Sequence, residues 1–265
     1  ETAAGETTRV LELKQASQSF VFVGIEAEPI PSVLRGFSAP VKLDYRRDRK
    51  TLAFLSGHDS DGFNRWEAMQ RLLLEVLLEW VELCQQGVQT APRLDADLLF
   101  AFAQTLQDSS LDAATISEAL MVPSETYLGD QLALVDVDAI HQARQWLLTA
   151  LARELQPVFL ALYQANATPQ PYQFTPSAMG QRRLKNLCLT YLMSLQQPAS
   201  IALCQAQLQQ ANNMTDEFAA LAALNYWAPV DHPARVSALQ DFYYKWQHDR
   251  LVVNKWLALQ ASASQ

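Results

Sequence analysis

The chain has 265 residues, of which 49% are hydrophobic and 18% are charged, so it can bury a core and is not disordered. Its 28 acidic and 20 basic residues give a net charge of −8, which argues against nucleic acid or an anionic membrane as the main partner. Cys84, Cys188 and Cys204 are odd in number and widely spaced, which excludes a disulfide framework and a zinc pattern. We expect buried thiols in a reducing cytosol.

The β-type patterns of the sequence lie in residues 1–46. Thr7–Lys14 alternates polar and apolar residues, Phe20–Ile25 is rich in β-branched and aromatic residues, and Pro40–Tyr45 alternates again. Three strands rarely form an independent sandwich, because their unpaired edges invite further pairing. We therefore expect either a small β appendage on a helical body or the end of a larger β domain.

The stretch Asp59–Gly87 predicts one long helix. Asp59, Ser60 and Asp61 can cap its first turn, and Gly87 can adopt the left-handed conformation that often ends a helix. Apolar residues cover more than half of the circumference, so this helix needs neighbours on several sides, as in a layered helical array. The polar residues share one stripe, which consists of Arg71, Glu75, Glu79, Glu82, Gln85 and Gln86.

Helical patterns fill the chain after Arg46, and Pro157 should kink or split one of these helices. Short links make consecutive helices antiparallel neighbours. No strict repeat is present, but the rhythm of paired helices predicts a mainly α fold, an irregular α-superhelix of the HEAT or armadillo type. The other expected helices are Asp48–His58, Asp95–Gln107, Asp112–Met121, Ser124–Leu132, Asp138–Ala165, Pro176–Gln196, Pro198–Gln210, Thr215–Trp227, Pro233–His248 and Leu251–Ala261.

Known catalytic patterns are missing from the sequence. No histidine begins a His-Glu-x-x-His motif, and no two histidines lie three or four residues apart, the spacing that a helical zinc site requires. The sequence has no phosphate-binding glycine loop and no G-x-S-x-G elbow. Asp136 and Asp138 open a helix, so we favour capping over acid–base chemistry. Surface or capping positions are the preferred interpretation of His58, His141, His232 and His248.

Arg182, Arg183 and Lys185 form the notable basic cluster of the sequence. A solvated helix face is the plain interpretation, and a wall of a peptide chamber or a domain contact is the alternative. An aromatic run near the end favours core packing over a ligand surface. This run consists of Phe242, Tyr243, Tyr244 and Trp246.

Three stretches resemble the bacterial aminopeptidase N (alanyl aminopeptidase) family of zinc metallopeptidases. They are Pro29–Tyr45 (PIPSVLRGFSAPVKLDY), Asn212–Leu224 (NNMTDEFAALAAL) and Phe242–Gln260, which ends in LVVNKWLALQ. Shorter similarities such as HDSDGFNRWEA, VPSETY and VDVDAI follow in the order of the family, so the resemblance covers nearly the whole chain. Asn254 is a departure, because the family usually has an aspartate there.

The resemblance implies that the catalytic machinery lies upstream of this chain. The family carries there a His-Glu-x-x-His zinc motif, a third glutamate ligand, a Gly-Ala-Met-Glu-Asn loop and an oxyanion-stabilising tyrosine. None of these is in this sequence, so we expect no catalytic, metal or cofactor residue here, and zinc only in the parent enzyme. The family also continues past Gln260. We expect residues 1–46 to be the terminal strands of an Ig-like β-sandwich spacer domain, and residues 47–265 an incomplete C-terminal helical domain.

The resemblance further implies a function for this chain. We expect a non-catalytic fragment of a bacterial, cytoplasmic zinc aminopeptidase that removes N-terminal residues from peptides. Its helical domain would cover the active site, with the catalytic domain of the same parent chain and short peptides as partners. Chamber or domain-contact roles would fall to Arg182, Arg183 and Lys185. The alternatives are a stand-alone α-solenoid scaffold for protein interactions and an enzyme with an unrecognised site.

Overall fold

The computed structural model describes residues 8–167 and 171–263, and their contacts divide the chain into two units, Glu1–Val33 and Leu34–Gln265. Residues 8–33 form no helix and no strand, so the strands expected in Thr7–Lys14 and Phe20–Ile25 are not formed in the described residues; Thr7 lies outside them. A strand requires a neighbour for its backbone hydrogen bonds. These segments have none, and Val10 and Val21 remain 82% exposed.

The backbone structure of residues 34–46 also differs from the predicted strand. A short 3-10 helix spans Arg35–Phe37, and Gly36 adopts φ 60°, which glycine tolerates without steric cost. The Gly36 N–H donates to Asp61 Oδ2 at 2.9 Å, and this bond joins the segment to the start of the long helix. Gly36 thus forms the turn, but Pro40–Tyr45 does not continue as the predicted strand.

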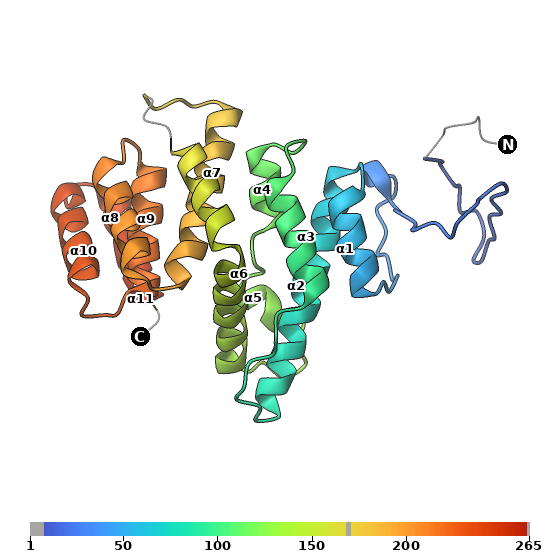
Figure 1. Cartoon of the computed structure of the whole chain (residues 1–265), viewed down its shortest axis with the longest axis horizontal. Helices are drawn as coiled ribbons and strands as arrows, with labels where there is room; N and C mark the ends of the chain where they lie inside the picture. Colours follow the sequence, from blue (N-terminus) through green and yellow to red (C-terminus); the bar gives the residue numbers. More distant parts are fainter. Residues whose placement is uncertain (1–7, 168–170, 264–265) are drawn as a thin grey trace. The chain divides into compact units, whose positions relative to one another are not determined.

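The unit Leu34–Gln265 is an array of α-helices (Figure 1). Every expected helix is confirmed, and the largest shift of an end is three residues, as where α5 ends at Gly129 and not at Leu132. The helices are α1 (Arg49–His58), α2 (Gly62–Gln85), α3 (Ala96–Gln107), α4 (Ala113–Ala119), α5 (Glu125–Gly129), α6 (Val137–Asn166), α7 (Pro176–Ser194), α8 (Pro198–Gln210), α9 (Met214–Trp227), α10 (Pro233–Trp246) and α11 (Arg250–Ala261).

Side-chain caps fix where these helices begin. In every described α-helix except α8, the residue before the first turn accepts a hydrogen bond from a backbone N–H of that turn. Asp61 caps α2 and Asp136 caps α6, as predicted. The cap of α9 is Asn213, whose Oδ1 accepts from the Asp216 N–H at 3.0 Å.

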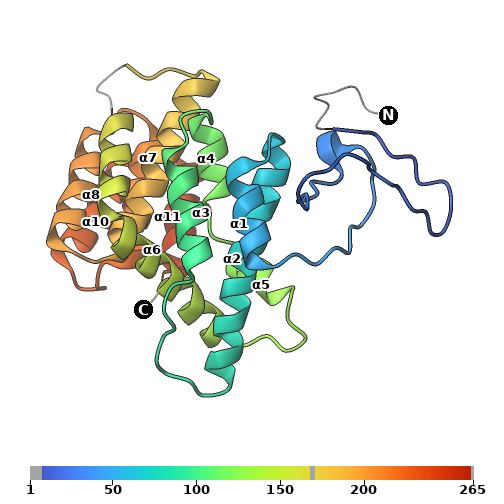
Figure 2. The same ribbon diagram turned by 45° about the vertical axis from the view of Figure 1, so that its right-hand side comes forward.

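The array is built from contacts between helices that are consecutive in the chain and between helices that are farther apart in it. α1 packs on α2 and α3, α2 on α6, α6 on α7, and α7 on both α4 and α9; α8 and α10 then pack on α9, and α11 on α10 (Figures 1 and 2). The long helix α2 contacts α1, α3, α4 and α6, so it has the several neighbours that its broad apolar surface required. Pro157 kinks α6 as predicted: Leu155 departs to φ −113°, ψ 16°, because proline lacks an N–H and its ring displaces the preceding turn.

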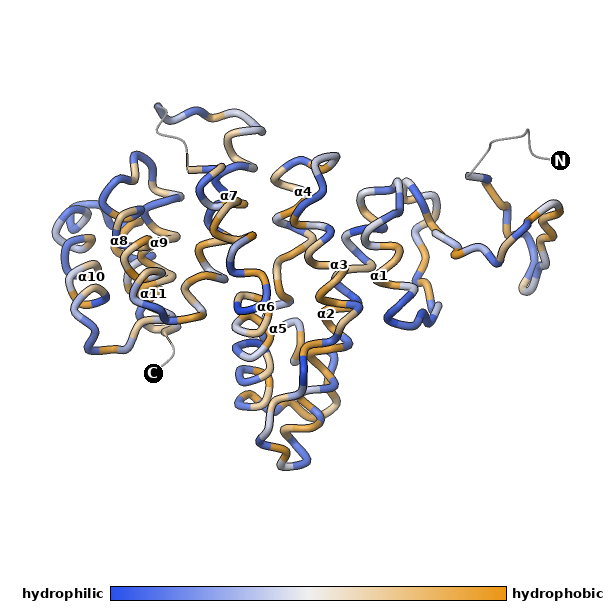
Figure 3. Tube along the Cα trace, viewed as in Figure 1, coloured by the Kyte–Doolittle hydropathy of each residue, from blue (hydrophilic) through white to orange (hydrophobic). Residues whose placement is uncertain are grey.

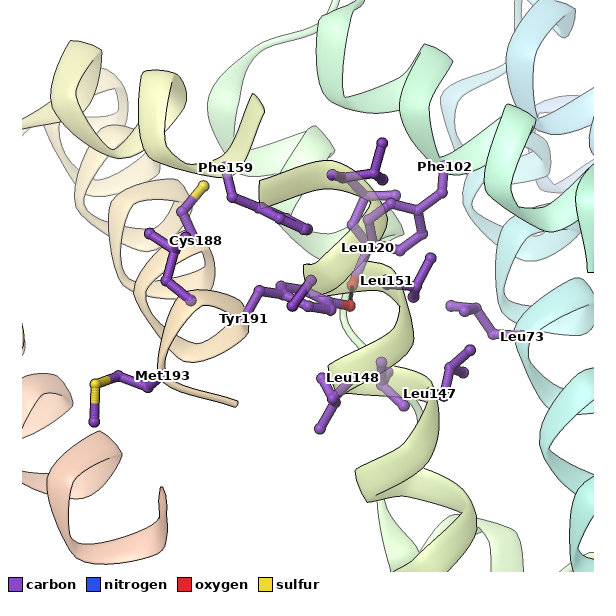
Figure 4. Packing of buried hydrophobic residues seen from close by; sticks show 14 of the residues in the cluster. Leu73, Phe102, Leu120, Leu147, Leu148, Leu151, Phe159, Cys188, Tyr191 and Met193 are labelled. Carbon is purple, nitrogen blue, oxygen red and sulfur yellow. Dashed lines mark hydrogen bonds between the residues drawn. The ribbon is translucent and has the colours of Figure 1, made fainter. Parts of the chain in front are cut away.

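The hydrophobic core runs through the whole array, and hydrophobic and hydrophilic residues alternate along its helices (Figure 3). An aromatic cluster fills its centre (Figure 4). The rings of Phe159 and Tyr191 stack with centroids 4.5 Å apart, and Phe102 meets Tyr191 edge-on at 5.6 Å. The Tyr191 hydroxyl donates to the Leu120 carbonyl at 2.8 Å, so α7 is joined to the end of α4. Complete burial raises the pKa of Tyr191, because the phenolate would lose its hydration.

Candidate functional site

Helix α7 presents two faces to two hollows of the helical array. It contacts α4, α6, α8 and α9, and residues three and four positions apart share a face of a helix. The first face carries Ala178, Gln181, Arg182 and Lys185. The second face carries Arg183, Asn186, Leu187 and Thr190. Adjacent arginines therefore point toward different hollows.

The first hollow is a polar pocket of about 540 Å³ between α6, α7, α8 and the start of α9. Its volume is in the range of small-molecule sites. Such sites are lined mainly by apolar side chains, whereas this lining contains many amide side chains. The polar pocket is lined by Tyr163, Asn166, Ala167, Pro171, Tyr172, Gln173, Ala178, Gln181, Arg182, Lys185, Gln207, Gln210, Ala211, Asn212, Asn213 and Asp216.

A buried ion pair forms the floor of the polar pocket. The Lys185 ammonium donates to Asp216 Oδ2 at 2.6 Å, and the two residues are only 9% and 6% exposed. Asn186 and Asn213 each donate an amide N–H to the same carboxylate at 3.0 Å. A buried carboxylate is tolerated when a counter-charge and hydrogen bonds replace its hydration. These three donors supply both, so Asp216 is fully compensated.

Two further groups shape this pocket. Arg182 lies half-buried at its side, donates to the Gln173 carbonyl at 3.1 Å, and places its guanidinium carbon 4.8 Å from the centroid of the Tyr172 ring. Tyr163 lies against the floor, and burial raises its pKa to about 12. The Tyr163 hydroxyl therefore stays protonated at neutral pH and can donate a hydrogen bond.

The second hollow is an apolar groove of about 460 Å³ on the opposite face of α7. Both of its arginines are paired: Arg183 with Glu118 at 2.6 Å, and Arg144 with the Pro123 carbonyl at 2.7 Å. The groove is lined by Ser117, Met121, Arg144, Leu148, Arg183, Asn186, Leu187, Thr190, Ala219, Ala222, Ala223, Asn225, Tyr226, Trp227, Leu259 and Ser262.

The structure separates the predicted basic cluster. Arg182 and Lys185 line the polar pocket, and Arg183 lines the apolar groove. The interpretation as a solvated helix face is correct for Arg183, whose side chain is 45% exposed. It is wrong for Lys185, which is buried. The sequence analysis missed Asp216, the counter-ion of Lys185. The sequence indicated Asp216 only indirectly, because this residue lies within NNMTDEFAAL, a stretch that carries the family resemblance.

Structural contacts are made by two of the predicted surface or capping histidines, His141 and His232, and by part of the aromatic run. His232 caps α10 through Nδ1, as the capping interpretation predicted, while His141 pairs with Glu125 at 2.8 Å. Within residues 8–167 and 171–263, no three His, Cys, Asp or Glu side chains come together as a metal site. In the aromatic run, Phe242 is buried in the core, but Tyr244 is 58% exposed and does not pack there.

The cysteines are free thiols, and Cys188 and Cys204 are buried as predicted, while Cys84 is half-buried. Burial raises the pKa of both buried thiols to about 12, which keeps them protonated and unreactive. In the described part of the chain, no helix combines the length and the apolar character needed to cross a membrane.

Two family models match the chain. One, a domain of unknown function (DUF3458_C) with ARM repeats, matches residues 49–265. The other, a domain of unknown function (DUF3458) with an Ig-like fold, matches residues 1–46. The armadillo-type array expected from the sequence agrees with the first description, and the Ig-like fold expected for residues 1–46 agrees with the second.

Bacterial aminopeptidases are among the relatives of this chain. It is 36% identical to aminopeptidase N of Escherichia coli (strain K12) over 254 residues, which are 96% of this chain and 28% of that protein. It is also 36% identical to aminopeptidase N of Haemophilus influenzae over 253 residues, with the same shares. The crystal structure of Legionella pneumophila aminopeptidase A in complex with aspartic acid superposes with a TM-score of 0.76 at 28% identity, over 92% of this chain and 29% of that one. The chain thus spans little more than a quarter of the length of these relatives.

Proposed function

Because the chain belongs to the DUF3458_C family with ARM repeats and is homologous to the C-terminal part of bacterial aminopeptidase N, we propose that it is the non-catalytic part of a zinc aminopeptidase. Its role is to cover the active site of the catalytic domain in the same parent chain and to restrict access to peptides. The observation that carries this proposal is the proportion of the match: 96% of this chain, but 28% of the relative. Zinc chemistry in such an enzyme polarises the scissile carbonyl and activates a water molecule.

The surface of the array suits a wall that faces peptides. Armadillo-type arrays present extended surfaces on which segments of chain can lie. Two hollows of different chemistry flank α7, one polar and one apolar, and their volumes are about 540 and 460 Å³. Such a wall can accept short, variable peptides, and a folded protein would be excluded by its size.

A replacement experiment tests the proposal. The matching segment of E. coli aminopeptidase N is exchanged for this chain, and hydrolysis of alanine p-nitroanilide is compared with removal of an N-terminal alanine from a small folded protein. The unmodified enzyme is the matched control. We expect both the hybrid and the control to cleave the small substrate and to spare the folded protein.

The isolated chain provides the second part of the test. We expect no hydrolysis of alanine p-nitroanilide and no stoichiometric zinc in the purified chain. Turnover that tracks bound zinc would contradict the non-catalytic role. A folded hybrid that cleaves small substrate but also trims the folded protein would contradict the role in substrate access.

A further inference from the structure

The polar pocket has more hydrogen-bond donors and more positive charge than its own residues use. Asp216 already accepts from Lys185, Asn186 and Asn213, so its carboxylate needs no additional partner. An ammonium has three N–H donors, and among the described residues Lys185 uses one, toward Asp216. Arg182 adds a second cation at the side of the pocket. With one carboxylate against two cations, the described part of the lining has one positive charge in excess.

The floor also holds an acceptor that has no hydrogen-bond partner among the described residues. The Gln207 side chain is 6% exposed, and its Nε2 donates to Asn186 Oδ1 at 2.7 Å and to the Asp216 carbonyl at 3.0 Å. These two acceptors fix the orientation of the amide. Its Oε1 is buried and finds no hydrogen-bond partner in the part of the chain that the structure describes. A buried polar atom of this kind costs free energy until a donor meets it.

These features together define a complementary ligand. Spare N–H groups on Lys185 and Arg182 suit a carboxylate, since a guanidinium and a carboxylate form short, charge-assisted hydrogen bonds. Gln207 suits an N–H close to that carboxylate. The rings of Tyr163 and Tyr172 offer apolar surface for a side chain between these polar groups. A carboxylate, an adjacent N–H and a side chain are the parts of an α-amino acid residue at a free C-terminus.

We propose that the polar pocket binds an α-carboxylate, either of a free amino acid or of the C-terminal residue of a peptide. This inference rests on the proposed function, because peptides and released amino acids are the molecules that a peptidase meets. Arg182 and Lys185 hold the carboxylate, and the lining beyond them accepts the neighbouring N–H and side chain. The site is distinct from the apolar groove, which lies on the other face of α7.

Titration of the purified chain with three small probes tests this site. N-acetyl-L-alanine carries the carboxylate and the amide, L-alanine carries the carboxylate and an ammonium, and N-acetyl-L-alanine amide has no negative charge. We expect N-acetyl-L-alanine to bind with a Kd of about 1 mM or tighter, measured by NMR chemical-shift changes. The neutral amide should bind at least about tenfold more weakly, because it loses the charge-assisted bonds.

A matched pair of variants locates the binding. Arg182→Gln removes one cation from the pocket and should weaken N-acetyl-L-alanine about tenfold or more. Arg183→Gln, the adjacent residue on the other face, should leave the affinity unchanged. Circular dichroism confirms that each variant is folded.

The results of these titrations show whether the polar pocket binds a carboxylate. They also show whether that carboxylate belongs to a peptide or to a free amino acid. Stronger binding of N-acetyl-L-alanine than of L-alanine assigns the site to peptide C-termini, and the reverse assigns it to free amino acids. The proposal is overturned if no probe binds at about tenfold higher concentration than expected, if the neutral amide binds equally well, or if Arg183→Gln is as damaging as Arg182→Gln. Failure here together with a size-selective hybrid enzyme would leave the proposed function intact.

Discussion

The centre and the end of the helical array are held together by different means, and two adjacent carboxylates at the start of α9 show the difference. Asp216 pairs with Lys185 of α7 at 2.6 Å, and Glu217 pairs with Lys245 of α10 at 2.8 Å. Both carboxylates are buried, but the Lys185 side chain is 11% exposed and that of Lys245 is 53% exposed. In the Lys185–Asp216 pair both side chains are shielded from water. In the Lys245–Glu217 pair the lysine side chain is in contact with water.

The apolar contacts follow the same division. α7 contributes a row of buried residues to the core, and α6 packs on it with the stacked rings of Phe159 and Tyr191. α11 has no buried residue, and Leu251 on it is 77% exposed. Because burial of apolar surface is the main source of stability, the centre should behave as the cooperative unit and the end as a weakly attached layer.

The largest effect is expected for Phe159→Ala in the centre. The ring is 0% exposed, and its loss removes contacts with Tyr191 and Phe102 and leaves a cavity. We expect the free energy of unfolding to fall by about 3–5 kcal/mol. Urea unfolding followed by circular dichroism measures it. Tyr244→Ala on α10, at a side chain that is 58% exposed, is the control and should cost less than about 0.5 kcal/mol. Equal losses in the two variants would refute the division between centre and end.

The two ion pairs give the next contrast. Lys185→Met leaves Asp216 buried without its counter-charge, and we expect a loss of about 3 kcal/mol, because removal of one partner of a buried pair is strongly destabilising. Lys245→Met should cost no more than about 1 kcal/mol, since the Lys245 side chain is 53% exposed and the Trp246 Nε1–H still donates to the buried Glu217 at 3.3 Å. The same urea experiment compares the two variants. A larger loss for Lys245→Met would mean that burial does not set the strength of these pairs.

A smaller effect is expected for the hydroxyl of Tyr191. Tyr191→Phe keeps the ring stack but leaves the buried Leu120 carbonyl without its donor, which should cost about 1–3 kcal/mol. Tyr243→Phe, at a ring that is 37% exposed, is the matched control with an expected change below about 0.5 kcal/mol. No loss in Tyr191→Phe would show that the α4–α7 connection depends on packing alone.

The sequence predicted the helical array well because its signals are local. In α2, the period of apolar residues and the cap at Asp61 are both encoded within a few turns, and the structure confirms them. The kink in α6 could be predicted for the same reason, because its cause, Pro157, lies at the kink itself. The strand patterns of residues 8–46 were a weaker signal of structure. A strand forms only when its backbone pairs with another strand, which can lie elsewhere in the sequence.

The candidate site was less accessible to sequence reasoning. The spacing of Arg182 and Lys185 placed them on one face of a helix, but nothing local could show that this face is buried. Asp216 lies 31 residues after Lys185, and the two meet only because α9 packs on α7. The Gln207 oxygen, which has no partner within residues 8–167 and 171–263, depends on the packing of α8 as well, so it has no signature in sequence.

The smallest effect is expected at the far end of the array, for Trp256→Phe in α11. The half-buried indole donates from Nε1 to the Leu239 carbonyl at 3.0 Å and packs against the Tyr243 ring at 4.9 Å. Phenylalanine keeps most of the ring contact and loses the hydrogen bond, so global unfolding should change by no more than about 1 kcal/mol. Hydrogen exchange supplies the sharper measurement: amides of α10 and α11 should exchange faster, while those of α6 and α7 stay as in the wild type. Faster exchange throughout the array would instead show that the end and the centre unfold as one unit, because a local opening cannot raise exchange in helices that it leaves packed.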